Sequence, residues 1–215
     1  MAHVDTRPRK EVPELAAVFA TAEAAMGFVP NSMLTMAHMP QLPMAFLMLT
    51  SVVFGADLKG TIDAFKDAVP EPDDPQANLA PDLVQLIALA TSVSAGCRYC
   101  QAHTSHNAHR RGAQGEKLDA LLQFESSALY SPQERAVLSL AFAAGRVPNE
   151  AEVGHFQVLR EYYTDRQIIQ IVAVISMFGF LNRWNDTLAT TLEAAPVEFA
   201  EKALGALAWR VDKHA

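Results

Sequence analysis

Residues 96–111 read Gly-Cys-Arg-Tyr-Cys-Gln-Ala-His-Thr-Ser-His-Asn-Ala-His-Arg-Arg and contain both cysteines of the chain, Cys97 and Cys100. The cysteines form a C-x-x-C pair, and histidines follow at three-residue steps. Within this stretch only Gly96 breaks a helix, and basic side chains crowd the far end, where cations suit the helix macrodipole. The pattern therefore predicts a helix whose first turn carries both thiols.

On such a helix Cys97, Cys100 and His103 follow one another at three-residue spacing, so Cys100 has a neighbour on each side. A thiol near a helix N-terminus and beside an imidazole can have its pKa lowered from about 8.5 to roughly 3.5–7.5. Two cysteines this close in a cytoplasmic protein indicate redox or metal chemistry and not a stabilising disulfide framework. We expect Cys97, which follows Gly96, to be the more exposed of the two.

The composition predicts a folded, soluble protein. The chain has 215 residues, of which 50% are hydrophobic and 19% charged, which argues against disorder. Its net charge of −7 argues against a nucleic-acid partner. The first ten residues lack the apolar segment of a secretory signal, and the longest apolar run, Ile168 to Leu181, falls short of the ~20 residues of a membrane span. We therefore expect a cytoplasmic protein with no membrane contact.

Helix signals recur along the whole chain. Apolar residues after Pro81 keep helical spacing, and Ser131-Pro-Gln-Glu134 has the form of a capping box with proline at the first helical position. Similar starts occur at 149–152, with asparagine as the cap, and at 164–167. Earlier helices are expected at about 12–26, after the turn at 27–31, from Pro40 to about Phe54, and around 63–68. Because no alternating strand pattern occurs, the sequence predicts an all-α fold.

An internal repeat relates two parts of the chain. The segment from Val84 to Cys100 aligns without gaps with the segment from Ile169 to Asn185. The alignment pairs Gln85 with Gln170, Arg98 with Arg183, and the two cysteines with Asn182 and Asn185. We infer a duplicated helical unit in which only the first copy carries thiols, within a compact bundle and not a solenoid. The expected layout is a single domain, 1–215, with an N-terminal helical extension at about 1–54, a thiol-bearing core at about 80–125 and the second copy at about 131–192.

The helix with C-x-x-C and a histidine one turn later, followed by a second copy ending Asn182-Arg-Trp-Asn-Asp186, resembles the carboxymuconolactone decarboxylase superfamily. The closer match is its alkylhydroperoxidase D-like, peroxidase-related branch, over about Val12 to Leu192. This resemblance implies an all-α homo-oligomer, a trimer or hexamer, that needs no cofactor. It further implies an antioxidant enzyme, a thiol-dependent peroxidase or disulfide reductase. Its substrate would be a hydroperoxide, and its reductant a dithiol such as a lipoyl-carrying protein.

The resemblance also implies roles for single residues. Cys100 would attack the hydroperoxide, and Cys97 would resolve the sulfenic acid. The base is assigned from the position of the histidines on the helix, which favours His103. At 100° per residue His103 lies about 60° around the helix from Cys100, and His106 about 120°. The family's relay glutamate is replaced here by Gln85, and its histidine position is occupied by Thr104, one residue after His103.

Gln85, His106 and Tyr99 are candidates for a proton relay or a supporting role, and His109 is expected at the surface. Gln85 alternatively packs as a neutral amide. The polar residues of the second copy, Asn182, Arg183, Asn185 and Asp186, either line the site or form buried hydrogen bonds.

Other interpretations of the thiol pair remain open. Both cysteines could be small buried hydrophobic residues. With His103 they offer three metal ligands, but zinc takes about four in a structural site, and we expect no metal. A lyase of the carboxymuconolactone decarboxylase type is an alternative function, although that chemistry does not need a C-x-x-C. A non-catalytic redox sensor of the same fold is a further alternative.

Overall fold

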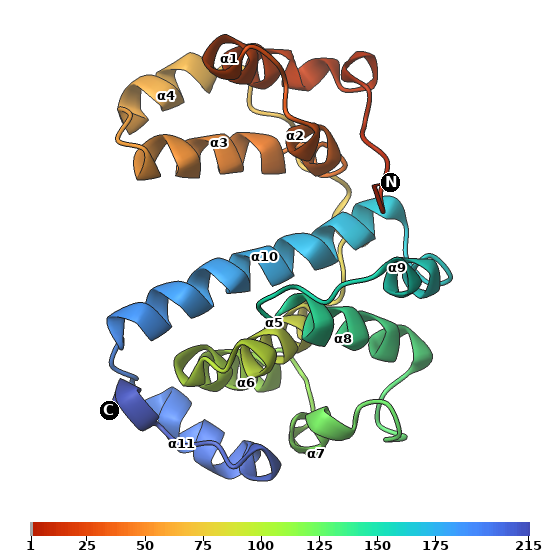
Figure 1. Ribbon diagram of the computed structural model, residues 1–215, viewed down its shortest axis with the longest axis vertical. Coiled ribbons are helices and arrows are strands. Elements are labelled where there is room, and N and C mark those ends of the chain that lie inside the picture. The colour runs from red at the N-terminus through yellow and green to blue at the C-terminus, as the bar shows by residue number, and fades with distance from the viewer. Residues whose placement is uncertain (1) are drawn as a thin grey trace. The chain divides into compact units, whose positions relative to one another are not determined.

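The computed structural model describes residues 2–215, and no strand occurs among them, which confirms the prediction of an all-α fold. The α-helices are α1 Ala16–Met26, α2 Asn31–Met36, α3 Leu42–Val53, α4 Leu58–Phe65, α5 Pro81–Ala95, α6 Arg98–Arg110, α7 Gly115–Asp119, α8 Pro132–Ala144, α9 Val153–Leu159, α10 Asp165–Leu188 and α11 Ala194–Ala203 (Figure 1). Short 3-10 helices are η1 Arg9–Glu11, η2 Pro13–Leu15, η3 Pro75–Ala77, η4 Ala120–Gln123, η5 Gly205–Leu207 and η6 Asp212–His214.

The chain divides into two compact units by its contacts. The first unit comprises the residues up to Asn78 together with Asp165–Ile169, and the second comprises Leu79–Thr164 and Gln170–Ala215. The expectation of a single domain stays a prediction, because this division groups contacts and does not test whether either unit folds alone.

The first unit has its own apolar core, formed by α1 to α4 and the segment before them. Its buried members are Val12, Leu15, Val18, Phe19, Ala22, Met33, Ala37, Met44 and Phe65. The predicted turn after α1 is confirmed, because Gly27 has φ 80° and ends the helix. The helix predicted at 63–68 begins earlier, at Leu58, because the Asp57 side chain caps it by accepting hydrogen bonds from the backbone of Lys59 and Gly60.

In the second unit α5 packs against both α6 and α8, and α11 packs against α6 (Figure 1). Leu86, Ile87 and Leu89 of α5 are fully buried. The predicted capping box of α8 is confirmed, since Ser131 and Glu134 exchange side chain–backbone hydrogen bonds of 2.9 and 3.3 Å. The predicted asparagine cap at Asn149 is wrong: Glu152 is the N-cap of α9, and the His155 ring accepts from its backbone N–H.

The two copies of the repeat differ at one position that decides the site. In the first copy Gly96 has φ 78° and separates α5 from α6. The residue aligned with it in the second copy is Leu181, and there α10 continues without a break to Leu188. Only glycine adopts this left-handed conformation at little cost. The first copy therefore has a helix N-terminus at the cysteines, and the second copy does not.

One face of α10 is apolar and exposed. Met177, Phe180, Trp184 and Leu188 have exposed fractions of 51%, 43%, 56% and 61%. Their spacing of three or four residues puts them in one stripe. By length and composition α10 could also cross a membrane, but a single such helix is weak evidence, because core helices of soluble proteins pass the same test.

We predict that Gly96→Ala lowers the free energy of unfolding by about 1–2 kcal/mol, the cost of a side chain in the left-handed region. A Cβ at Gly96 meets no atom within 4 Å, so the loss comes from the backbone conformation and not from a clash. Urea denaturation measures the change. The control is Gly154→Ala in α9, where space is also open and φ is not positive; this variant should be at least as stable as the parent.

The exposed stripe of α10 predicts a homo-oligomer, a trimer or a dimer-based hexamer. The double substitution Phe180→Glu and Trp184→Glu should dissociate it, because burying two carboxylates in an apolar contact is unfavourable. Sedimentation velocity measures the mass. Val158→Glu on α9, a position with an exposed fraction of 44%, is the matched control and should leave the assembly intact. A stable monomer of the parent chain would contradict the prediction.

Candidate active site

The junction between α5 and α6 positions the first cysteine. Gly96 turns the chain, and the backbone N–H of Cys97 then donates to the carbonyl of Ser92 over 3.2 Å. The Gln101 side chain donates to the same Ser92 carbonyl, also over 3.2 Å. Cys97 is the N-cap of α6, so its side chain lies at the positive end of the helix macrodipole. The expected thiol-bearing helix is confirmed, with Cys97 just before its first turn.

The two thiols form a close, buried pair. Cys97 and Cys100 are both free, and they lie 3.5 Å apart. Their exposed fractions are 1% and 3%. The expectation that Cys97 is the more exposed thiol is therefore wrong, because the chain around the junction covers both side chains.

The pair is electrostatically asymmetric. A hydrogen bond from the Cys100 thiol to the Cys97 sulfur lowers the pKa of Cys97, although burial opposes this shift. The same hydrogen bond, together with burial, raises the pKa of Cys100, because it favours the protonated form. Asn185 donates to the Cys100 sulfur over 3.5 Å and offsets only part of that effect. Of the two thiols, Cys97 therefore has the lowered pKa and Cys100 the raised pKa.

The histidines of α6 lie towards α11 and the segment before it. His103 pairs with Glu193 over 2.7 Å and stacks on Tyr99, with ring centroids 4.4 Å apart. Tyr99 donates to the other oxygen of Glu193 over 3.2 Å. The pKa of the Tyr99 phenol is raised, first by burial and then by the charge of this carboxylate. His106 has its ring centroid 5.6 Å from that of Phe199. The roles predicted for His103, Tyr99 and His106 remain predictions. His103 and Tyr99 contact each other and Glu193, and His106 contacts Phe199 of α11.

The second copy of the repeat contributes directly to the thiol site. Asn185, the counterpart of Cys100, is the residue that donates to the Cys100 sulfur. Asn182, the counterpart of Cys97, is buried, and its amide oxygen and nitrogen have no hydrogen-bond partner among the described residues. The amide oxygen of Gln85 is likewise buried and unpartnered, whereas Gln170 accepts from the backbone of Leu79. The polar residues of the second copy were expected either to line the site or to form buried hydrogen bonds. Asn185 lines the site, because it contacts the Cys100 sulfur.

A histidine that the sequence did not single out lies beside Cys97. Cys97, Asp186 and His214 each offer one side-chain atom that could bind a metal ion, namely a sulfur, a carboxylate oxygen and a ring nitrogen. These three atoms lie within 4.8 Å of one another. His214 is fully buried, and its Nε2 lies 3.6 Å from Asp186 Oδ1. These three atoms are one fewer than a closed structural zinc site uses. No local motif marks His214, because it lies more than a hundred residues from Cys97 in a short polar segment.

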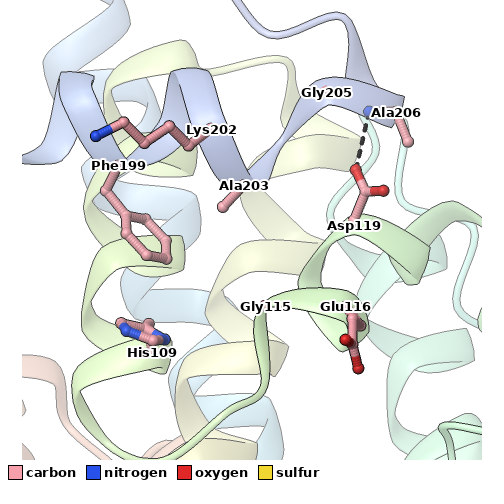
Figure 2. Close-up of a pocket in the computed structure, with 9 residues that line it drawn as sticks. All are labelled: His109, Gly115, Glu116, Asp119, Phe199, Lys202, Ala203, Gly205 and Ala206. Atoms are coloured by element: carbon pink, nitrogen blue, oxygen red, sulfur yellow. Dashed lines mark hydrogen bonds between the residues drawn. The ribbon is translucent and has the colours of Figure 1, made fainter.

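A separate cavity of about 640 Å³ opens between the end of α6, α7, α11 and η5 (Figure 2). His109 and Phe199 line it, with ring centroids 5.0 Å apart, and Asp119 accepts from the backbone of Ala206 at its other side. Neither cysteine lines this cavity. The predicted surface position of His109 agrees with its place at the cavity wall.

Comparisons with known proteins bear on the same part of the chain. The model of the carboxymuconolactone decarboxylase family matches residues 57–143, a range that includes both cysteines. The uncharacterized protein YdfG of Bacillus subtilis (strain 168) is 30% identical over 107 residues, which cover 47% of this chain and 67% of YdfG.

Among solved structures, the apo form of the debrominase Bmp8 is 34% identical with a TM-score of 0.55, and the match covers 92% of this chain and 96% of Bmp8. A cysteine-to-alanine variant of Bmp8 in complex with 2,3,4-tribromopyrrole matches at 34% identity and TM-score 0.55, covering 94% of this chain and 98% of that one. A protein of unknown function from Agrobacterium tumefaciens is 23% identical with a TM-score of 0.50, covering 52% and 77%, and shows the fold alone.

We predict that the two thiols ionise in different pH ranges. In Cys100→Ser the serine hydroxyl can still donate to Cys97, so the remaining thiol should react with iodoacetamide at neutral pH. In Cys97→Ser the remaining thiol is buried, its pKa stays raised, and alkylation should need alkaline pH. The measurement is the alkylation rate against pH, followed by mass spectrometry. Superimposable profiles for the two variants would contradict the asymmetry.

Proposed function

We propose that the chain, which belongs to the carboxymuconolactone decarboxylase family, is a thiol-dependent oxidoreductase. It reduces a small electrophilic substrate and is left with a Cys97–Cys100 disulfide. The observation that carries this proposal is the pair of free, buried thiols 3.5 Å apart at the start of α6. Vicinal thiols at this separation need little movement to form a disulfide of about 2.05 Å.

The first candidate substrate is a hydroperoxide. A cysteine thiolate attacks one peroxide oxygen, the O–O bond breaks, and the alkoxide leaves as an alcohol after taking up a proton. The product on the enzyme is a sulfenic acid, which the second thiol displaces to give the disulfide and water. An external dithiol, such as a dihydrolipoyl group, then reduces the disulfide. A second thiol this close forms the disulfide quickly and so protects the sulfenic acid from further oxidation to the irreversible sulfinic acid.

The structure favours Cys97 as the attacking residue. Its pKa is lowered and it is the N-cap of α6, whereas the pKa of Cys100 is raised. In the second step the Cys100 sulfur displaces the hydroxyl group of the sulfenic acid, and the Cys100 proton leaves with that hydroxyl as water. The opposite order, with Cys100 attacking, is the one implied by the family resemblance. Trapping the intermediate decides between the two orders.

The second candidate substrate is a brominated aromatic compound, favoured by the 34% identity to the debrominase Bmp8 over nearly all of both chains. In reductive debromination the thiolate attacks bromine, the C–Br bond breaks, and the ring carbon takes a proton. The resulting sulfenyl bromide is displaced by the second thiol, which gives the disulfide and releases bromide with a proton. Both candidate reactions therefore use the same two sulfurs and the same external dithiol.

The protein should consume a dithiol donor in the presence of an organic hydroperoxide or 2,3,4-tribromopyrrole. Turnover is followed with dihydrolipoamide as donor, and alcohol, bromide and debrominated pyrrole are the products measured. Cys97→Ser should abolish turnover with the active substrate. Cys100→Ser should allow a single turnover and, with hydroperoxide, leave a sulfenic acid on Cys97 that dimedone traps.

A dimedone adduct on Cys100 in Cys97→Ser, with none on Cys97 in the converse variant, would reverse the two roles. Thiols that stay free in the parent chain after both substrates would rule out the oxidoreductase and point to the sensor. Conversion of 4-carboxymuconolactone that survives both serine substitutions would instead establish the lyase.

A further inference from the structure

His214 has a feature that no structural role explains. Its Nδ1 lies 2.9 Å from the backbone carbonyl of Thr190. Because a carbonyl oxygen only accepts, Nδ1 carries the hydrogen and Nε2 of the neutral ring carries the lone pair. That Nε2 is buried and has no hydrogen-bond partner among the described residues. A buried acceptor left without a partner costs free energy, so its position calls for an explanation.

The unpartnered nitrogen lies in the thiol cluster. Its ring belongs to the group in which the donor atoms of Cys97, Asp186 and His214 are within 4.8 Å of one another. Asp186 Oδ1 is 3.6 Å from Nε2, which is too long for a good hydrogen bond but close enough for electrostatic attraction. A catalytic base often lies slightly beyond hydrogen-bond distance until substrate binds, and one water can also bridge the gap.

The charged and titratable groups around His214 come from each element packed against it. On α6 these are Cys97, Cys100 and Tyr99, whose ring centroid is 5.8 Å from that of His214. On α10 the group is Asp186, and next to His214 itself is Lys213, which pairs with the other oxygen of Asp186 over 2.6 Å. The Asp186 carboxylate disfavours a thiolate on Cys97. A protonated His214 ring between the Cys97 thiolate and the Asp186 carboxylate would offset the repulsion between these two anions.

We propose that His214 is the proton acceptor of Cys97 and that Asp186 stabilises the imidazolium that forms. This proposal rests on the proposed function. The proton moves from the Cys97 sulfur to Nε2 and leaves a thiolate–imidazolium pair. After the attack on substrate, the same proton passes from Nε2 to the leaving alkoxide or to the ring carbon. The ring returns to its neutral form, and no further reactant is needed.

His103, the base expected from its position on the helix beside Cys100, is placed differently. Its Nε2 is engaged by Glu193 at 2.7 Å, and its side chain has an exposed fraction of 31%. His214 is fully buried, and its Nε2 has no hydrogen-bond partner among residues 2–215. A buried imidazole beside a thiol changes the ionisation of that thiol more than an exposed one does, because water screens it less.

The test uses the Cys100→Ser chain, in which Cys97 is the only thiol, after dialysis against a chelator. The rate of alkylation by iodoacetamide is measured against pH with no substrate present. His214→Asn retains a donor near the position of Nδ1 for the Thr190 carbonyl and removes the group at Nε2. We expect it to move the midpoint for Cys97 upward by about one pH unit or more.

His214→Gln, which places an uncharged amide near Nε2, should produce a shift in the same direction. His109→Asn on α6 is the matched control, because His109 contacts Phe199 at the separate cavity, and it should leave the profile unchanged. An unchanged profile in a folded His214→Asn chain would overturn the proposal. A shift caused by His103→Gln, with none from His214→Asn, would also overturn it and assign the role to His103.

A second measurement needs no substitution of His214. With ¹⁵N-labelled histidine in the Cys100→Ser chain, the Nε2 resonance reports whether that nitrogen carries a proton. Alkylation of Cys97 removes the thiolate, so the fraction of Nε2 that carries a proton should fall. A resonance that does not respond to alkylation would contradict the proposal even if both His214 variants failed to fold. Since neither measurement uses turnover, absence of activity with every substrate would contradict the proposed function and leave this test standing.

Discussion

The left-handed turn at Gly96 is the constraint on which the thiol site depends. It ends α5, lets the Cys97 backbone donate to the Ser92 carbonyl, and starts α6 with Cys97 as its N-cap. A continuous helix would satisfy the Cys97 N–H within the helix and remove the N-terminal end of the macrodipole from the sulfur. The second copy of the repeat has this continuous form, with Leu181 in place of Gly96. One glycine thus separates a copy that can carry a reactive thiol from one that cannot.

Burial alone would make both cysteines poor nucleophiles, since removing water disfavours a thiolate. The hydrogen bond between the two thiols opposes the effect of burial on the pKa of Cys97 and adds to it for Cys100. Cys100 donates to Cys97, and its own ionisation is suppressed in consequence. The amide of Asn185 then holds the Cys100 sulfur from the side of α10. The hydrogen bond between the two sulfurs therefore makes Cys97 the more acidic thiol and Cys100 the less acidic one.

Much of the architecture could be predicted from the sequence, because its signals are local. The capping box at Ser131, the glycine at the end of α5 and helical spacing from Pro81 each involve residues within one or two turns. The start of α4 at Leu58 was missed because an aspartate cap, Asp57, outweighed the apolar pattern farther along. The site was predicted in part: the C-x-x-C is local and visible. The position of His214 beside Cys97 depends on how distant segments pack, and no pattern along the chain encodes it.

The repeat links these observations to the proposed chemistry. One pair of counterparts in the two copies is in direct contact, since Asn185 donates to Cys100, the residue with which it aligns. Where one copy has sulfurs the other has amides, and an amide can donate to a thiolate without undergoing redox chemistry itself. Asp186, one residue farther, adds a carboxylate that opposes ionisation of Cys97. Without a cation nearby, this carboxylate would raise the pKa of Cys97 and oppose the effect of the helix N-terminus, which lowers it. The second copy thus supplies both a stabilising amide and a charge that a buried cation beside Cys97 must balance.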